Sequence, residues 1–224
     1  MSNTKADEKI GVIWDLPLRL FHWLLVCAVI GAVITSKNGM MFWHEKMGLM
    51  VLGLLGFRIV WGFVGTHHAR FSNFLVRPQK VLAYLKLRLS GDKDYHPGHA
   101  PTGAYATLIL IAVLLTMASL GTMANDDILY EGPLAAYVGD FSGDARRYHY
   151  IVEKIVYAVI GLHLIAMIIY RVFFKIRLVP AMIHGGKDAN QSRPSMSHQI
   201  GGVVLLIVMI AAAQSLGLLG DRFY

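Results

Sequence analysis

The sequence predicts an all-α integral membrane bundle, and two observations favour this fold class. Of the 224 residues, 55% are hydrophobic and only 16% are charged, whereas a soluble domain of this length carries more charge. The apolar residues also gather in runs of about 20, the length that an α-helix needs to cross the hydrocarbon core of a bilayer. We therefore expect a single transmembrane domain over residues 1–224, with spans at about 17–36, 43–64, 103–123, 148–174 and 199–219.

The first span is expected to remain in the chain as a helix. The polar N-terminus, MSNTKADEKIGVIWD, lacks the short apolar core and the small-residue cleavage site that mark a signal peptide. Pro17 suits the first turn of a helix, where its missing N–H is not needed. Cys27, the one cysteine of the sequence, excludes internal disulfides, cysteine-ligated clusters and the CxxCH attachment of c-type haem.

Charged residues between the spans set the expected orientation. Residues 65–102 hold six lysines and arginines against two aspartates, whereas residues 125–144 hold five carboxylates and no lysine or arginine. By the positive-inside rule, the first connection is cytoplasmic and the second is periplasmic. This places the N-terminus in the cytoplasm and the C-terminus in the periplasm. The net charge of +7 therefore indicates membrane orientation and not nucleic-acid binding, and residues 77–89 are expected to form an amphipathic helix on the membrane surface.

The fourth span carries two histidines, His149 and His163. They are 14 residues apart, so on an α-helix they lie about 21 Å apart along the axis and differ by only about 40° in rotation. Both rings therefore leave the same face at different depths. A polar imidazole in hydrocarbon is costly unless it is paired, so the pair predicts a functional site; the alternative is two histidines that hydrogen-bond to neighbouring helices.

Two other spans each bring one histidine to a matching depth. His22 lies near the cytoplasmic end of the first span and His163 lies in the cytoplasmic half of the fourth, whereas His44 and His149 lie at the periplasmic ends of the second and fourth. Facing helices of a bundle can each supply one axial imidazole to a haem iron, whose other four ligands come from the porphyrin. We predict an inner haem b between His22 and His163 and an outer haem b between His44 and His149. Ligation by two histidines leaves no open position on the iron, which suits electron transfer.

Several cationic residues are expected near the haem propionates. Arg58 lies 14 residues after His44, so it shares a face with His44 at the inner depth, where a buried guanidinium needs an anion. The alternative is an arginine that snorkels to the cytoplasmic surface. Arg19, one turn before His22, is a second inner candidate. The outer candidates are Lys37, Lys46 and Arg147.

Gly48, one turn after His44, bears on whether a macrocycle approaches the helix here and on whether the sequence carries a zinc-protease motif. A glycine there lets a macrocycle approach the helix backbone, although tight helix packing, which also favours glycine in membranes, is the preferred interpretation. His44 and Glu45 begin an HE pair, but the residue four places after His44 is Gly48. The HExxH pattern of zinc proteases therefore fails.

The remaining histidines are interpreted as solvated residues of connections and span edges: His67, His68, His96, His99, His184 and His198. His198 is the best replacement if one of the four predicted ligands is wrong. A transporter that uses intramembrane histidines as proton relays is an alternative from another functional class. It predicts a colourless protein, whereas two b haems give a red one.

Several motifs occur in an order that resembles the bacterial cytochrome b561 family, which includes the b-type cytochrome subunits of nickel-iron hydrogenases. The motifs are WDLPLRLFHWLL, HEKMGLMVLGLLGFRIVWGFVG, HARFSNF, PGHAPTGA, NDDILYEGPLA and HLIAMIIYRVFFKIRLVPAMIHGGK, and they cover residues 13–187. The resemblance implies a four-helix bundle with two non-covalent b haems, ligated at His22, His44, His149 and His163. The fifth span departs from this pattern.

The resemblance also implies a function. The leading hypothesis is a dihaem conduit in the bacterial inner membrane that exchanges electrons between quinone or quinol and a periplasmic redox protein, such as a c-type cytochrome or a catalytic metalloenzyme subunit. Such a protein is an electron-transfer component of an oxidoreductase. The alternative is a membrane anchor and electron-transfer subunit of a hydrogenase-like or other dehydrogenase complex. The quinone site is not located by the sequence.

Overall fold

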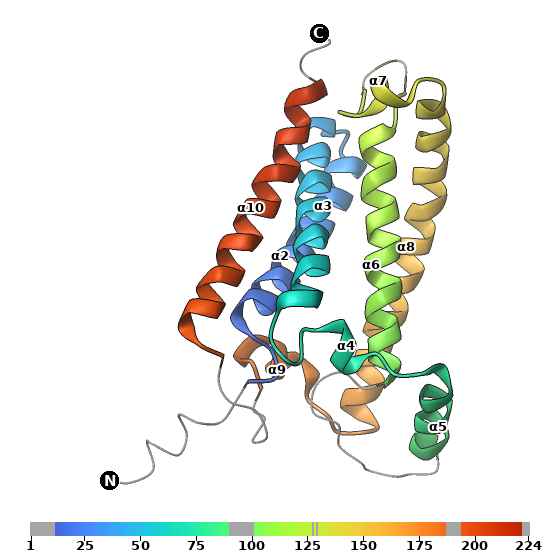
Figure 1. The fold of residues 1–224 in the computed structure, drawn as a ribbon. Coiled ribbons are helices and arrows are strands. Elements are labelled where there is room, and N and C mark those ends of the chain that lie inside the picture. The colour runs from blue at the N-terminus through green and yellow to red at the C-terminus, as the bar shows by residue number, and fades with distance from the viewer. Residues whose placement is uncertain (1–11, 90–100, 127, 129, 187–193, 221–224) are drawn as a thin grey trace. The chain divides into compact units, whose positions relative to one another are not determined.

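The computed structural model describes residues 12–89, 101–126, 128, 130–186 and 194–220. Five long helices account for most of this part of the chain (Figure 1). They are α2 (Leu16–Lys37), α3 (Met41–Val64), α6 (Pro101–Met123), α8 (Phe141–Val172) and α10 (Met196–Gly220). Shorter helices lie between them: α4 (Phe71–Phe74), α5 (Pro78–Leu89), α7 (Ala135–Val138) and α9 (Leu178–His184).

All five long helices are long and apolar enough to cross a membrane, which confirms the predicted all-α class and its five spans. The predicted surface helix at 77–89 is also present, as α5. The helix α8 begins at Phe141, seven residues before the predicted start of the fourth span, so residues 141–147 extend the helix beyond the apolar run. Asp144 lies in the first turn of α8, where a negative charge complements the helix dipole.

Contacts divide the chain into two units, each made of portions of the long helices. The first unit is Met1–Arg19, Val60–Ile109 and Gly161–Val203, and the second is Leu20–Ile59, Leu110–Ile160 and Val204–Tyr224. The single-domain organisation stays a prediction.

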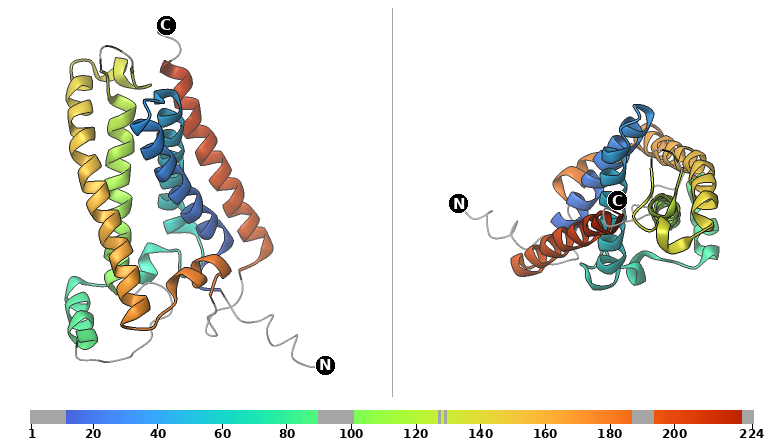
Figure 2. Two further views of the ribbon diagram at one scale, coloured as in Figure 1. Left: turned by 180° about the vertical axis from the view of Figure 1, so that it is seen from behind. Right: turned by 90° about the horizontal axis from the view of Figure 1, so that it is seen from above.

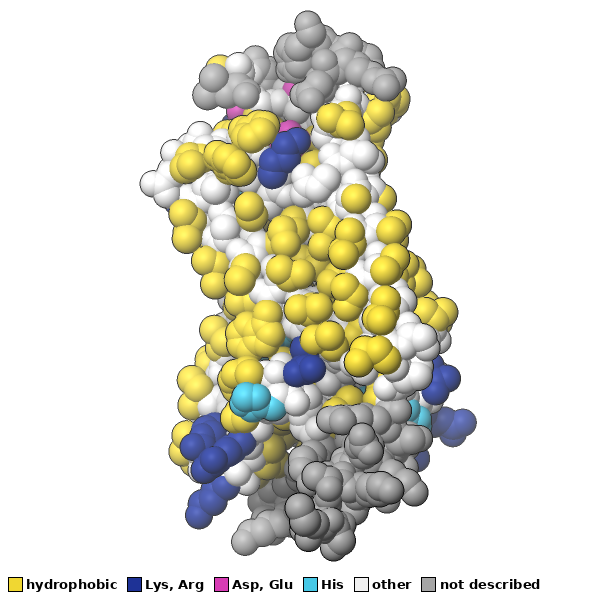
Figure 3. Space-filling view, turned by 90° about the vertical axis from the view of Figure 1, so that its left-hand side faces the viewer, with side chains coloured by type: hydrophobic (Ala, Val, Ile, Leu, Met, Phe, Trp, Pro, Cys, Tyr) yellow, Lys and Arg dark blue, Asp and Glu magenta, His cyan; other side chains and the backbone are white. Residues whose placement is uncertain are grey.

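In the second unit, α3 forms the centre of the packing. Leu54, Leu55 and Phe57 of this helix are fully buried. The helix α10 lies against α3 so closely that a Cβ atom on Gly53 would be 2.6 Å from the Met209 carbonyl oxygen. Figure 2 shows α6 beside α8 in its views from behind and from above. Apolar side chains gather on the face drawn in Figure 3, as expected for spans that face lipid.

Replacing Gly53 with valine is expected to weaken the docking of α10. The added side chain would meet backbone atoms of Met209 and Ile210 within 2.7 Å, and a helix backbone cannot move aside as a flexible side chain can. We expect a loss of about 1–3 kcal/mol in the free energy of unfolding, as for an overpacked core, measured by thermal unfolding in detergent. Gly201→Ala is the matched control, because a Cβ atom there meets nothing within 4 Å.

In the first unit, Asp15 joins three segments of the chain. Its side chain is 1% exposed. One carboxylate oxygen caps the start of α2 by accepting the Leu18 N–H at 2.8 Å, and the other accepts the indole N–H of Trp61 at 3.0 Å and the hydroxyl of Thr66 at 2.6 Å. The capping bond explains why α2 begins at Leu16, since Asp is a preferred N-cap residue.

The segment after α8 folds back onto the start of α2 in the same unit. The Trp14 N–H donates to the Gly185 carbonyl at 2.8 Å, and the Arg19 guanidinium donates to the Ile183 carbonyl at 2.6 Å. These bonds fix α9 beside the N-terminal end of α2.

Candidate functional site

Two of the four predicted ligands meet in the second unit. The ring of His44, in the first turn of α3, and the ring of His149, in α8, have centroids 6.2 Å apart and planes at 89°. Both side chains are half-buried. The structure therefore brings together the outer pair that the sequence predicts.

Each of these rings is held by a backbone carbonyl of another helix. The Nδ1 atom of His44 lies 2.8 Å from the Ala32 carbonyl oxygen of α2, and the Nδ1 atom of His149 lies 3.0 Å from the Met117 carbonyl oxygen of α6. A carbonyl only accepts hydrogen bonds, so in the neutral ring Nδ1 carries the hydrogen and Nε2 carries the lone pair. A histidine that ligates a metal is oriented in this way, because the carbonyl fixes both the tautomer and the direction of the ring.

The separation of the two rings fits one metal between them. A metal lies about 2 Å from an imidazole nitrogen and the ring centroid about 1 Å behind that nitrogen, so two imidazoles on opposite sides of one metal have centroids roughly 6 Å apart. Among the described residues, no group of three or more His, Cys, Asp or Glu side chains is placed to hold a metal ion. A metal that brings its own equatorial ligands, as haem does, fits this pair of imidazoles.

The surroundings of Gly48 are open. A Cβ atom added there would meet nothing within 4 Å. The preferred interpretation of this glycine as a tight packing contact is therefore wrong. Open space one helical turn from His44 is instead compatible with a flat group that approaches the backbone of α3.

Gly121 of α6 is a site residue that the sequence analysis missed. A Cβ atom on Gly121 would lie 3.1 Å from Cε1 of His149, so this glycine leaves the space that the ring occupies. Tyr130 lies beyond the end of α6, and its hydroxyl donates to the Gly121 carbonyl at 3.4 Å. Burial raises the pKa of Tyr130, and the negative charge of Glu45 raises it further, so the phenol keeps its hydrogen at neutral pH.

Replacing Gly121 with valine is expected to displace the His149 ring and to weaken or empty the predicted outer haem position. The two γ-carbons would extend past a contact that is already tight at the Cβ atom, and the bond from Nδ1 to Met117 leaves the ring little freedom. Haem content and a redox titration of the α band measure the effect. Gly103→Val is the control on the same helix, because a Cβ atom there meets nothing within 4 Å. Identical titrations for the two variants would contradict the expectation.

The two inner ligands belong to different units. His22 is a half-buried residue of α2 in the second unit, and His163 is a half-buried residue of α8 in the first unit. The pairing of His22 with His163 stays a prediction from the sequence.

The predicted inner cations differ in their surroundings. The side chain of Arg58 is 2% exposed in the structure, so the alternative that it snorkels to the surface is wrong. The contact of Arg58 with a propionate stays a prediction from the sequence. Arg19 already donates to the Ile183 carbonyl in the first unit.

The predicted outer cations are mostly paired with carboxylates of the same unit. Lys37 lies 3.3 Å from Glu153, and Lys46 lies 3.5 Å from Glu45. Arg147 is exposed. Glu153, which also accepts the Tyr157 hydroxyl at 2.6 Å, lies one turn after His149, and the sequence analysis did not single it out. The roles of the three cations toward propionates stay predictions.

The other histidines show no second ligand pair within the described part of the chain. The His198 ring lies in the first turn of α10 with its centroid 5.0 Å from that of Trp61. The rings of His67 and His68 are 5.2 Å apart, and the backbone carbonyl of His67 accepts from the Asn73 amide at 2.9 Å. His184 ends α9, and His96 and His99 lie outside the described residues.

Comparison with known proteins places this site in a family. The model of the prokaryotic cytochrome b561 family matches residues 13–185. A curated relative from Azotobacter vinelandii, the probable Ni/Fe-hydrogenase B-type cytochrome subunit, is 30% identical over a stretch that covers 45% of this chain and 53% of the relative. The chain thus spans about half the length of the curated relative that it matches, and no solved structure matches it. These matches confirm the resemblance: the chain belongs to the prokaryotic cytochrome b561 family, whose members are multi-pass membrane proteins that hold haem b and transfer electrons.

Proposed function

We propose that this protein holds two b haems and carries electrons across the inner membrane between the quinone pool and a periplasmic redox partner. The observation that carries the proposal is the outer pair, in which His44 and His149 lie 6.2 Å apart and each donates from Nδ1 to a backbone carbonyl. The inner position rests on His22 and His163, which the sequence places at a second, matching depth. Arg19, Arg58, Lys37, Lys46, Arg147 and Gly48 are the proposed contacts of the haem edges and propionates.

The chemistry follows from what these residues supply. Haem, when bound, provides a one-electron couple at its iron. His44 and His149 would hold such a group through their Nε2 atoms, and ligation by two histidines would leave no position for oxygen or another substrate. The Ala32 and Met117 carbonyls increase the electron-donating power of the rings, because a hydrogen bond from Nδ1–H raises the basicity of Nε2. The residues of this site therefore favour electron transfer over bond-making chemistry.

The orientation of the chain supports a partner on the periplasmic side. By the positive-inside rule, the acidic segment 125–144 faces the periplasm, where its carboxylates would attract a basic redox protein. The Asp126 carboxylate accepts the Tyr130 N–H at 2.8 Å, which orders this part of the segment. The second candidate function is an anchor and electron-transfer subunit of a dehydrogenase complex, which the hydrogenase cytochrome relative favours.

Two measurements test the proposal. A pyridine haemochrome assay on the purified protein should give about two b haems per chain; one haem per chain would contradict the inner position. The partner-free protein should become reduced when quinol is added, and a protein that stays oxidised after prolonged exposure would argue against the quinone link. Co-purification of a large metal-containing subunit would favour the second candidate.

A further inference from the structure

We propose that the turn between α8 and α9 is a binding site for the phosphate group of an anionic phospholipid. A hollow of about 270 Å³ lies at this turn. Its lining comes from one continuous stretch of the first unit, from Met167 to Pro180. None of the four predicted histidine ligands lines the hollow, although His163 lies one turn before Met167 in α8.

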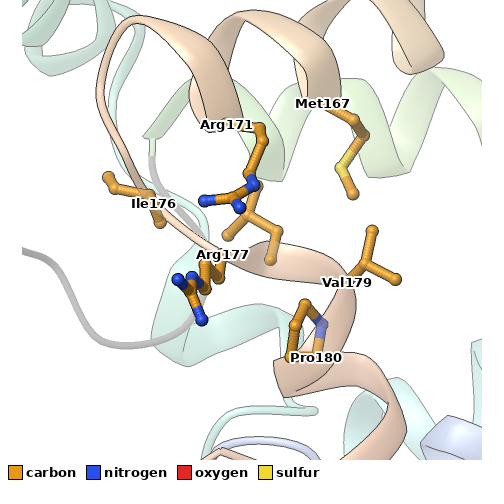
Figure 4. A pocket seen from close by; sticks show the side chains of 7 residues that line it. Met167, Arg171, Ile176, Arg177, Val179 and Pro180 are labelled. Carbon is orange, nitrogen blue, oxygen red and sulfur yellow. The ribbon is translucent and has the colours of Figure 1, made fainter.

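The turn brings two arginines together. The chain leaves α8 through Lys175, which has a left-handed backbone with φ of 58°, and the Ile176 N–H then donates to the Tyr170 carbonyl at 3.0 Å. This reversal returns Arg177 toward Arg171 in the last turn of α8. Figure 4 shows the two guanidinium groups on one side of the hollow. Within the described part of the chain, neither side chain has a hydrogen bond or ion pair, and the residues that line the hollow include no carboxylate.

The opposite wall of the hollow is apolar. Met167, Val179 and Pro180 lie there in Figure 4. A ligand that fits both walls needs an anionic group next to an apolar chain. Two guanidinium groups bind phosphate strongly, because each offers paired N–H donors in a plane that matches two phosphate oxygens.

The position of the hollow along the chain indicates where such a ligand comes from. The apolar span of α8 ends at Val172, one residue after Arg171. A cationic pocket at the end of a membrane span lies at the level of lipid headgroups, and basic pockets at this depth bind anionic headgroups. A free phosphate ion would use the arginines but would gain nothing from the apolar wall.

Native mass spectrometry of the haem-loaded protein in detergent tests the site, with phosphatidylglycerol, phosphatidylcholine and inorganic phosphate as separate probes. The variant is Arg171→Gln/Arg177→Gln. The control is Lys80→Gln/Lys86→Gln, which removes two exposed cations from α5 in the same unit. We expect the wild type and the control each to retain one more molecule of phosphatidylglycerol than the arginine variant does. The affinity of the arginine variant for this lipid should fall at least about tenfold, because two charge-assisted contacts are lost.

Three results would overturn the proposal. Equal retention of phosphatidylglycerol by the arginine variant and the wild type would show that the arginines do not bind the lipid. Equal retention of phosphatidylcholine by the wild type would show that negative charge is not recognised. Inorganic phosphate that binds as tightly as the lipid would assign the hollow to the free ion. The haem absorbance of each variant shows whether it has folded.

Discussion

The His149→Ala variant is expected to bind about one haem per chain where the wild-type protein binds about two, because an iron with one axial imidazole removed is held far less tightly. The structure adds a reason for the size of this effect. The His149 ring lies 6.2 Å from the ring of His44, and the other histidine of α8, His163, is 14 residues away along the helix, so α8 offers no neighbouring histidine to replace it. Haem content by pyridine haemochrome, together with a redox titration of the α band, measures the loss.

The matched variants assign the loss to one position. His44→Ala should remove the same redox component as His149→Ala, because the centroids of the two rings lie 6.2 Å apart in the second unit. His163→Ala should remove the other component and leave the outer one in place. If His44→Ala and His149→Ala removed different components, or if either emptied both positions in a folded protein, the proposed pairing would be wrong.

Removal of the Asp15 carboxylate is expected to cause the largest loss of stability among the substitutions considered. In Asp15→Ala, α2 loses its N-cap, which typically contributes about 1 kcal/mol. The Trp61 indole and the Thr66 hydroxyl also lose their buried acceptor, and each buried donor left without a partner costs about 1–3 kcal/mol. The three contacts share one carboxylate, so their contributions are coupled and do not simply add. We therefore expect a loss in the free energy of unfolding near the lower end of the summed range, roughly 3 kcal/mol.

Thermal unfolding in detergent, followed by circular dichroism, measures this change. Asp15→Asn keeps one oxygen acceptor and the shape of the side chain, so it should lose clearly less stability than Asp15→Ala. Asp144→Ala is the surface control, because Asp144 is exposed in the first turn of α8. A melting temperature for Asp15→Ala equal to that of the Asp144→Ala control would contradict the role of Asp15.

The sequence predicts the long helices well because their length and polarity are set by the bilayer. An apolar run of about 20 residues has few alternatives to a membrane span, and all five predicted spans are helical in the structure. The start of α8 was missed because residues 141–147 are too polar to resemble a span. Helical structure there depends on capping and tertiary contacts, which hydropathy does not report.

The candidate site likewise contains some features that the sequence predicts and others that depend on tertiary packing. His44 and His149 could be predicted because a histidine in an apolar run is unusual and its depth follows from helix geometry. The Ala32 and Met117 carbonyls and the space beside Gly121 could not, because every residue has a carbonyl and a glycine's neighbours depend on how two helices pack. The burial of Arg58 likewise follows from tertiary packing, which decided against snorkelling.

The carbonyl contacts of His44 and His149 explain what α6, a span without a histidine of its own, contributes to the site. Its Met117 oxygen aims one imidazole, as the Ala32 oxygen of α2 aims the other. Alanine scanning would not detect either contact, because replacing a side chain leaves the main-chain oxygen in place. A small shift of α6 along α8 would instead change the hydrogen bond between the Met117 carbonyl and His149. The midpoint potential of the outer couple should therefore depend on the register between these two helices, which no single ligand substitution would reveal.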